Sequence, residues 1–144
     1  GEVAAHLSES DSHLIDALKN YGLHLGNAFQ ITDDILDYCG LSESSGKNCG
    51  DDLKDGKQTL PLIYALERSC SASQTLIYQS LESGSTENLE KIQAILEDTG
   101  AIEECYKIAS QEGQKATSAL TPFPASPYKQ ALAELALFAV QRGH

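Results

Sequence analysis

The chain has 144 residues, 21 of them acidic and 10 basic, and a formal net charge of −11. A chain of this length can bury an ordinary hydrophobic core as one domain, and its shortage of Lys and Arg argues against a nucleic-acid partner. No stretch approaches the ~20 consecutive apolar residues of a membrane span, and Cys39, Cys49, Cys70 and Cys105 lack any C-x-x-C spacing, so we expect a soluble, cytoplasmic protein with free thiols and no stable membrane insertion.

Apolar residues recur at helical spacing along most of the chain, and no segment sustains the alternation of a half-buried strand. The sequence therefore predicts an all-α fold. The first long helix is expected to begin at Asp11 or Ser12 and to end at Gly40, because these residue types cap helix termini. Residues 41–58, rich in Gly and Ser, are expected to form an extended loop, followed by a helix over 59–69.

Four more helices are expected in the second half of the chain, each with its own start or stop signal. One begins at Ser71 or Ser73 and ends before Gly84, the next is capped by Thr86 and ends before Gly100, a third covers 101–120, and Ser126-Pro127 begins the last. Neither an internal repeat nor a linker is present. We therefore expect residues 1–144 to form a single helical domain.

An acidic cluster interrupts the apolar pattern near the end of the first long helix. Asp33, Asp34 and Asp37 lie within one helical turn, and Gln30 extends their polar face. Three carboxylates at this spacing repel one another, and the helix dipole disfavours negative charge at this end. An oxygen-only ligand set suits Mg²⁺, so the cluster predicts a magnesium site; the alternative is an acidic stripe that faces solvent.

Two lysines follow in the glycine-rich segment. Lys47 and Lys57 could bind a diphosphate as point charges opposite a metal held by the aspartates. A lysine in a loop is more often only solvated, so either residue alone is weak evidence.

The joint pattern is more specific. Gly26-x-x-Phe29-Gln30-x-x-Asp33-Asp34-x-x-Asp37, followed by Gly46-Lys47 and Gly50-x-Asp52-Leu53-x-x-Gly56-Lys57-x-Thr59-Leu60-Pro61, resembles the second aspartate-rich region of the (E)-polyprenyl diphosphate synthases, the trans-prenyltransferases. The segment from Ser126 to Arg142 is similar to the end of their bacterial long-chain members, above all the octaprenyl diphosphate synthases.

The resemblance implies a helical bundle of the isoprenoid synthase type and a Mg²⁺-dependent prenyltransferase that adds isopentenyl diphosphate to an allylic diphosphate. It implies that Asp33 binds a Mg²⁺ that holds the allylic diphosphate, with Asp34 and Asp37 in the direct or water-mediated shell. It further implies that Gln30, Lys47 and Lys57 contact that diphosphate. Asp52 is left with two possible roles, orienting a lysine or capping a helix, and no residue is assigned as catalytic acid, base or nucleophile.

The 144 residues correspond to the C-terminal half of the family's catalytic unit. They contain neither its first aspartate motif nor its basic Gly-Lys-Arg region, which binds isopentenyl diphosphate. We therefore expect a truncated chain that is inactive on its own, with part of the apolar face of the long helix uncovered. The family also implies a homo-oligomer, a dimer.

Three other interpretations stay open. The chain could be a non-catalytic regulatory subunit, although such a subunit has no physical need to keep the acidic cluster and the lysines. It could be an acidic helical interaction module, which leaves the Gly-Lys spacings unexplained. A terpene cyclase shares the scaffold but typically carries an Asn/Ser/Glu motif in place of the aspartate triplet.

Overall fold

The computed structural model describes residues 9–39 and 49–142, and this part of the chain contains helices and no strand. The prediction of an all-α fold is therefore confirmed. The helices are α2 (Glu9–Cys39), α4 (Asp51–Lys54), α5 (Leu60–Arg68), α6 (Ser71–Ser83), α7 (Leu89–Asp98), α8 (Ala101–Ser118) and α9 (Pro127–Gln141). None of the described helices combines the length and apolar character that a membrane crossing requires.

The described residues divide into two compact units. The first contains residues 9–29 and 109–142, and the second contains residues 30–39 and 49–108. The long helices α2 and α8 are each divided between the two units, with one segment in each. The expectation of a single domain stays a prediction.

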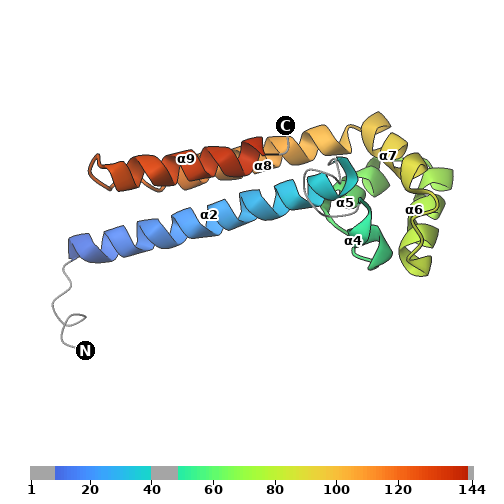
Figure 1. The fold of residues 1–144 in the computed structure, drawn as a ribbon, viewed down its shortest axis with the longest axis horizontal. Coiled ribbons are helices and arrows are strands. Elements are labelled where there is room, and N and C mark those ends of the chain that lie inside the picture. The colour runs from blue at the N-terminus through green and yellow to red at the C-terminus, as the bar shows by residue number, and fades with distance from the viewer. Residues whose placement is uncertain (1–8, 40–48, 143–144) are drawn as a thin grey trace, which may run out of the picture. The chain divides into compact units, whose positions relative to one another are not determined.

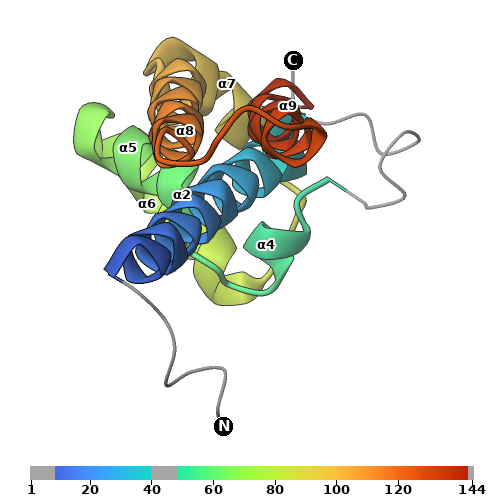
Figure 2. The same cartoon turned by 90° about the vertical axis from the view of Figure 1, so that its left-hand side faces the viewer.

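In the first unit, α9 folds back along the C-terminal segment of α8 (Figures 1 and 2). The two helices approach closely at Gly113, where an added Cβ would lie 2.7 Å from a methyl group of Val140. The N-terminal segment of α2 packs on this pair through Tyr21, which is buried and donates a hydrogen bond to the carbonyl of Leu132 (2.8 Å). The apolar cluster of the unit is formed by Tyr21, Ala116, Leu120 and Ala136.

The same segment of α2 leaves three large apolar side chains exposed. Ile15, Leu18 and Leu23 have exposed fractions of 41%, 49% and 59%. The expectation that the long helix has a partly uncovered apolar face is therefore met in the first unit.

The start of α9 follows its sequence signal. Ser126 has extended backbone angles, and its hydroxyl accepts a hydrogen bond from the amide of Lys129 (3.1 Å). Pro127 occupies the first helical position, where its missing amide hydrogen costs nothing. The predicted cap is confirmed.

In the second unit, α4 to α7 gather around the C-terminal end of α2 (Figure 1). Helices α5, α6 and α7 each turn a buried face inward, since their buried residues recur three or four positions apart. One cluster joins these faces, and its fully buried side chains include Tyr38, Leu53, Leu62, Ile77 and Ile92.

Three expectations were wrong in detail. Helix α2 begins at Glu9, so Asp11 and Ser12 lie within it rather than at its start. The segment expected as an extended loop contains the short helix α4 within its described part, while residues 41–48 lie outside the described residues. Helix α7 begins at Leu89 rather than after a Thr86 cap; the carbonyl of Thr86 instead accepts the amide of Leu89 in a turn (3.1 Å). At α4 the amide of Asp52 bonds to the carboxylate of Asp37 on α2, a contact that local spacing does not reveal.

Gly84 ends α6 with φ of 66°, in the left-handed region that favours glycine. A Cβ at this position would lie 2.7 Å from the carbonyl oxygen of Lys54. Gly84 therefore allows the end of α6 to lie directly against the end of α4.

Candidate functional site

The acidic cluster on α2 has one exposed and two buried members. Asp33 is exposed, whereas Asp34 and Asp37 have exposed fractions of 8% and 1%. Asp34 is followed by Ile35, which is fully buried, so this turn of α2 is embedded in the second unit. The alternative interpretation, a stripe of aspartates that faces solvent, is therefore wrong for Asp34 and Asp37.

Asp37 holds the beginning of α4. Its carboxylate oxygen Oδ2 accepts a hydrogen bond from the amide of Asp52 (3.2 Å), and its backbone carbonyl accepts the amide of Gly50 (2.9 Å). Gly50 has φ of 86°, which glycine adopts without strain. A negative charge near the first amides of a helix is favourable, so Asp37 ties α4 to α2 by electrostatics as well as by geometry.

Several neighbouring polar and charged groups act on the carboxyl of Asp34. Its Oδ1 accepts a hydrogen bond from Nε2 of Gln30 (3.0 Å). Burial raises the pKa of Asp34; the bond from Gln30 opposes this shift, the charge of Asp52 adds to it, Lys57 opposes it, and Asp33 adds to it. Gln30 and Lys57 therefore both act electrostatically on Asp34.

Beside these groups is the phenol of Tyr38, which is buried. Burial raises its pKa well above its ordinary value, and the charges of Asp37 and Asp52 raise it further. Tyr38 therefore stays a neutral phenol next to buried carboxylates. Sequence reasoning did not identify this residue, since a tyrosine at a buried helical position has no distinctive spacing.

The structure brings together most of the predicted site residues but not in the form of a finished metal site. Gln30, Asp33 and Lys57 are exposed, whereas Asp34 and Asp37 are buried. Among the described residues, no three His, Cys, Asp or Glu side chains converge as a group that could hold a metal ion. Lys47 lies outside the described residues. The assignment of metal and diphosphate ligands stays a prediction.

The two roles expected of Asp52, orienting a lysine or capping a helix, stay predictions. Asp52 is buried in the first turn of α4, where its backbone amide donates the hydrogen bond to the carboxylate of Asp37. Its carbonyl accepts the amide of Lys57 (2.7 Å), so Asp52 fixes the backbone that presents the lysine. The only sequence signal for it was the spacing Gly50-x-Asp52.

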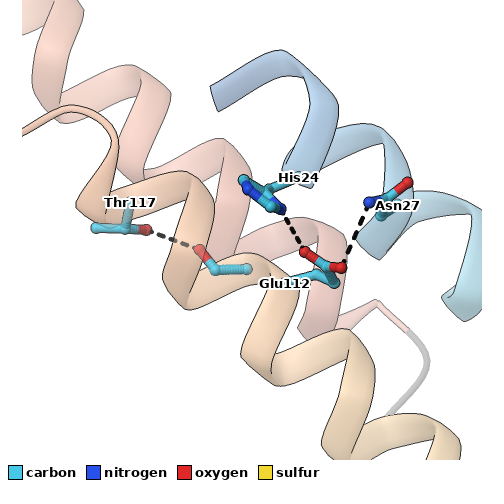
Figure 3. A network of polar contacts seen from close by, with 5 residues as sticks. His24, Asn27, Glu112 and Thr117 are labelled. Carbon is cyan, nitrogen blue, oxygen red and sulfur yellow. Dashed lines mark hydrogen bonds and ion pairs between the residues drawn. The ribbon is translucent and has the colours of Figure 1, made fainter. Parts of the chain in front are cut away.

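A separate polar network lies in the first unit. Figure 3 shows His24 and Asn27 of α2 directed toward Glu112 of α8. Glu112 accepts from Nδ1 of His24 (2.5 Å) and from Nδ2 of Asn27 (3.4 Å). Through Glu112, His24 connects α2 and α8.

Solved structures share this fold over nearly the whole chain. A polyprenyl synthase from Caulobacter crescentus, complexed with calcium and isoprenyl diphosphate, superposes with a TM-score of 0.86 at 39% identity, over 99% of this chain and 43% of that chain. A decaprenyl diphosphate synthase from Rhodobacter capsulatus gives 0.82 at 36% identity, over 92% and 42%. The fold is therefore that of the all-α polyprenyl synthases.

The sequence comparisons are more specific. Residues 1–99 match the family model of the polyprenyl synthetases. The chain belongs to this family. It is 44% identical over 127 residues to a geranyl-diphosphate-specific all-trans-nonaprenyl-diphosphate synthase of Rhodobacter capsulatus, covering 88% of this chain and 39% of that protein.

It is also 38% identical over 145 residues to the octaprenyl diphosphate synthase of Haemophilus influenzae, covering 100% of this chain and 44% of that protein. The chain thus spans about two fifths of the length of the curated relatives it matches. Members of the family have been crystallised with divalent metals, since a geranylgeranyl pyrophosphate synthase from Corynebacterium glutamicum is complexed with isoprenyl diphosphate and magnesium.

Proposed function

We propose that the chain supplies the allylic-diphosphate side of a polyprenyl diphosphate synthase, an enzyme that adds isopentenyl diphosphate to an allylic diphosphate. The observation that carries the proposal is the surroundings of Asp34, a buried carboxyl on which the exposed Gln30, Lys57 and Asp33 all act. A buried carboxylate whose pKa is raised is poorly compensated by its surroundings. A divalent cation held nearby would supply the missing positive charge.

The donors present fit Mg²⁺, because carboxylate oxygens are its preferred protein ligands and it keeps several waters in its shell. In this proposal Asp33, the exposed member, is the direct ligand, and Asp34 and Asp37 act directly or through water. The bound ion would stabilise the negative charge that develops on the departing diphosphate.

The chain's own residues bind and orient the diphosphate. Lys57, whose amide donates to the carbonyl of Asp52, is exposed and acts electrostatically on Asp34, the carboxyl that Gln30 also contacts. Lys47 contributes a second positive charge in the proposal. With the charge on the departing diphosphate stabilised in this way, the allylic C–O bond breaks and releases diphosphate. The double bond of isopentenyl diphosphate attacks the carbocation to form a C–C bond, and the proton then lost passes to the released diphosphate or to solvent. We assign no acid, base or nucleophile among these residues.

The proposal also covers the length of the prenyl product and the oligomeric state. We infer a long-chain, octaprenyl-like product from the similarity of the C-terminal segment, and a homodimer from the family. The spacing of Asp33, Asp34 and Asp37 recurs at Asp51, Asp52 and Asp55, but the 144 residues span only about two fifths of the length of the curated relatives. A polypeptide limited to these residues should therefore show no significant prenyl transfer, and turnover near that of full-length relatives would remove this part of the proposal.

Binding can be tested without turnover. Calorimetry of the chain with pyrophosphate should show Mg²⁺-dependent heat, and Asp33→Ala should weaken the affinity by roughly tenfold or more, because it removes a charged ligand. Asp98→Ala is the matched control, since Asp98 is an exposed carboxylate at the end of another helix of the same unit. No Mg²⁺-dependent heat, or equal affinity in the two variants, would eliminate the proposed site.

A further inference from the structure

Arg142, at the end of α9, makes two contacts with a single residue of α2. Its guanidinium carbon lies 4.6 Å from the centre of the Phe29 ring, and its Nη2 donates a hydrogen bond to the backbone carbonyl of Phe29 (2.6 Å). Both residues belong to the first unit, and Arg142 is half-buried. A charge-assisted bond and a cation–π contact to the same residue hold that residue in position and orientation.

The carbonyl that Arg142 binds lies inside a helix. In an α-helix the carbonyl of Phe29 also accepts the amide of the residue four positions later, which is Asp33. A carbonyl oxygen has two lone pairs and can accept both bonds. Because this carbonyl already has a helical partner, the bond from Arg142 is not needed to satisfy it. It is an additional restraint on Phe29.

Arg68 in the second unit provides an internal comparison. Its guanidinium carbon lies 5.2 Å from the centre of the Tyr64 ring, and its Nη1 donates to the carbonyl of Thr99 (3.3 Å). Thr99 follows the last residue of α7, where helix carbonyls lack partners, so this contact is ordinary capping. Arg142 makes the same two kinds of contact, but both are with Phe29, whose carbonyl lies inside a helix one turn before the predicted metal ligand.

We propose that Arg142 is a positioning residue for Asp33. Through the carbonyl and the ring of Phe29, it sets the orientation of the helical turn that presents the Asp33 carboxylate to the metal and diphosphate. This inference rests on the proposed function of Asp33 and goes beyond the aspartate motif itself, because Arg142 is separated from that motif by more than a hundred residues of sequence.

The experiment compares Arg142→Lys with Arg68→Lys. Each change keeps the positive charge and removes the planar guanidinium that can stack and donate at once. Calorimetry measures the affinity for pyrophosphate with Mg²⁺, thermal unfolding measures stability, and amide hydrogen exchange follows the amide of Asp33. We expect Arg142→Lys to weaken Mg²⁺-dependent binding by roughly fivefold and to speed exchange at Asp33. Arg68→Lys should leave the affinity within about twofold of the wild-type value, even if its melting temperature falls as far as that of Arg142→Lys.

A second variant guards against a folding defect. Phe29→Leu keeps the backbone carbonyl and removes only the ring, and it should produce a smaller loss of affinity in the same direction. The inference is overturned if wild-type protein binds Mg²⁺ and pyrophosphate and Arg142→Lys binds them equally well, or if both arginine variants lose affinity in proportion to their loss of stability. Absence of Mg²⁺-dependent binding in the wild-type chain is a different result, since it removes the proposed function and this inference together.

Discussion

The two units of the chain are stabilised in different ways. The second unit has a large apolar cluster, in which Tyr38, Leu62 and Ile77 are almost fully buried, and this unit also contains buried carboxylates. The first unit has a smaller cluster and connects its helices by polar contacts, from Tyr21 to Leu132 and from His24 to Glu112. Burying charge costs free energy, so the carboxylates are found where apolar packing is extensive. The unit without them depends on close helix contacts instead.

The largest effect should come from the core of the second unit. Leu62→Ala removes a fully buried side chain from the centre of the apolar cluster, and should lower the free energy of unfolding by about 2–5 kcal/mol. Urea denaturation followed by circular dichroism measures it. Leu137→Ala in the first unit is the matched control, because Leu137 is 56% exposed and should change stability by less than about 0.5 kcal/mol. Similar losses in both variants would contradict the contrast between the units.

A smaller effect is expected in the first unit from helix proximity. Gly113→Ala places a methyl group against Val140, a β-branched side chain with little freedom to move, and should cost about 1–2 kcal/mol. Gly22→Ala is the control, since a Cβ there meets nothing within 4 Å. In that exposed helical position alanine should instead stabilise by about 0.5–1 kcal/mol. If both glycines respond alike in thermal unfolding, close packing does not hold the first unit together.

The smallest effect concerns pH and the buried charge of the second unit. Because burial raises the pKa of Asp34, its protonated form is favoured in the folded protein. Its contribution to stability is therefore present below the ordinary pKa of an aspartate and is lost as pH rises through the raised value. The stability of Asp34→Asn relative to wild type should increase as pH rises through this window and then level off.

Urea unfolding of the two proteins at several pH values measures that difference. Asp98→Asn, an exposed carboxylate in the same unit, should show no comparable trend. A difference between Asp34→Asn and wild type that is constant with pH would mean that the carboxylates of the second unit are well compensated.

Local signals were sufficient for most of the helices. Gly84, Gly100 and the pair Ser126-Pro127 each mark a helix boundary in the structure, because glycine with positive φ and a serine cap act through neighbouring residues alone. Helix α4 was missed, since four residues are too few to show a helical period.

The sequence was enough to predict which residues make up the candidate site, but not which of their side chains are buried. Asp33, Asp34 and Asp37 share a helical turn, yet α4 covers Asp37 through a bond that spans fifteen residues of sequence. The partnership of Arg142 with Phe29 left no trace in local spacing at all. These features depend on contacts between distant segments, which a periodicity cannot reveal.

The glycine at the end of α6 also limits how this sequence can vary. At Gly84 the backbone angle disfavours any other residue, and the carbonyl of Lys54 occupies the space that a side chain would need. Two independent restrictions act on one position that lies outside the acidic cluster. In a library with every amino acid at each position, selected only for folding, position 84 should accept glycine alone, and would serve as a marker of intact architecture independent of catalysis.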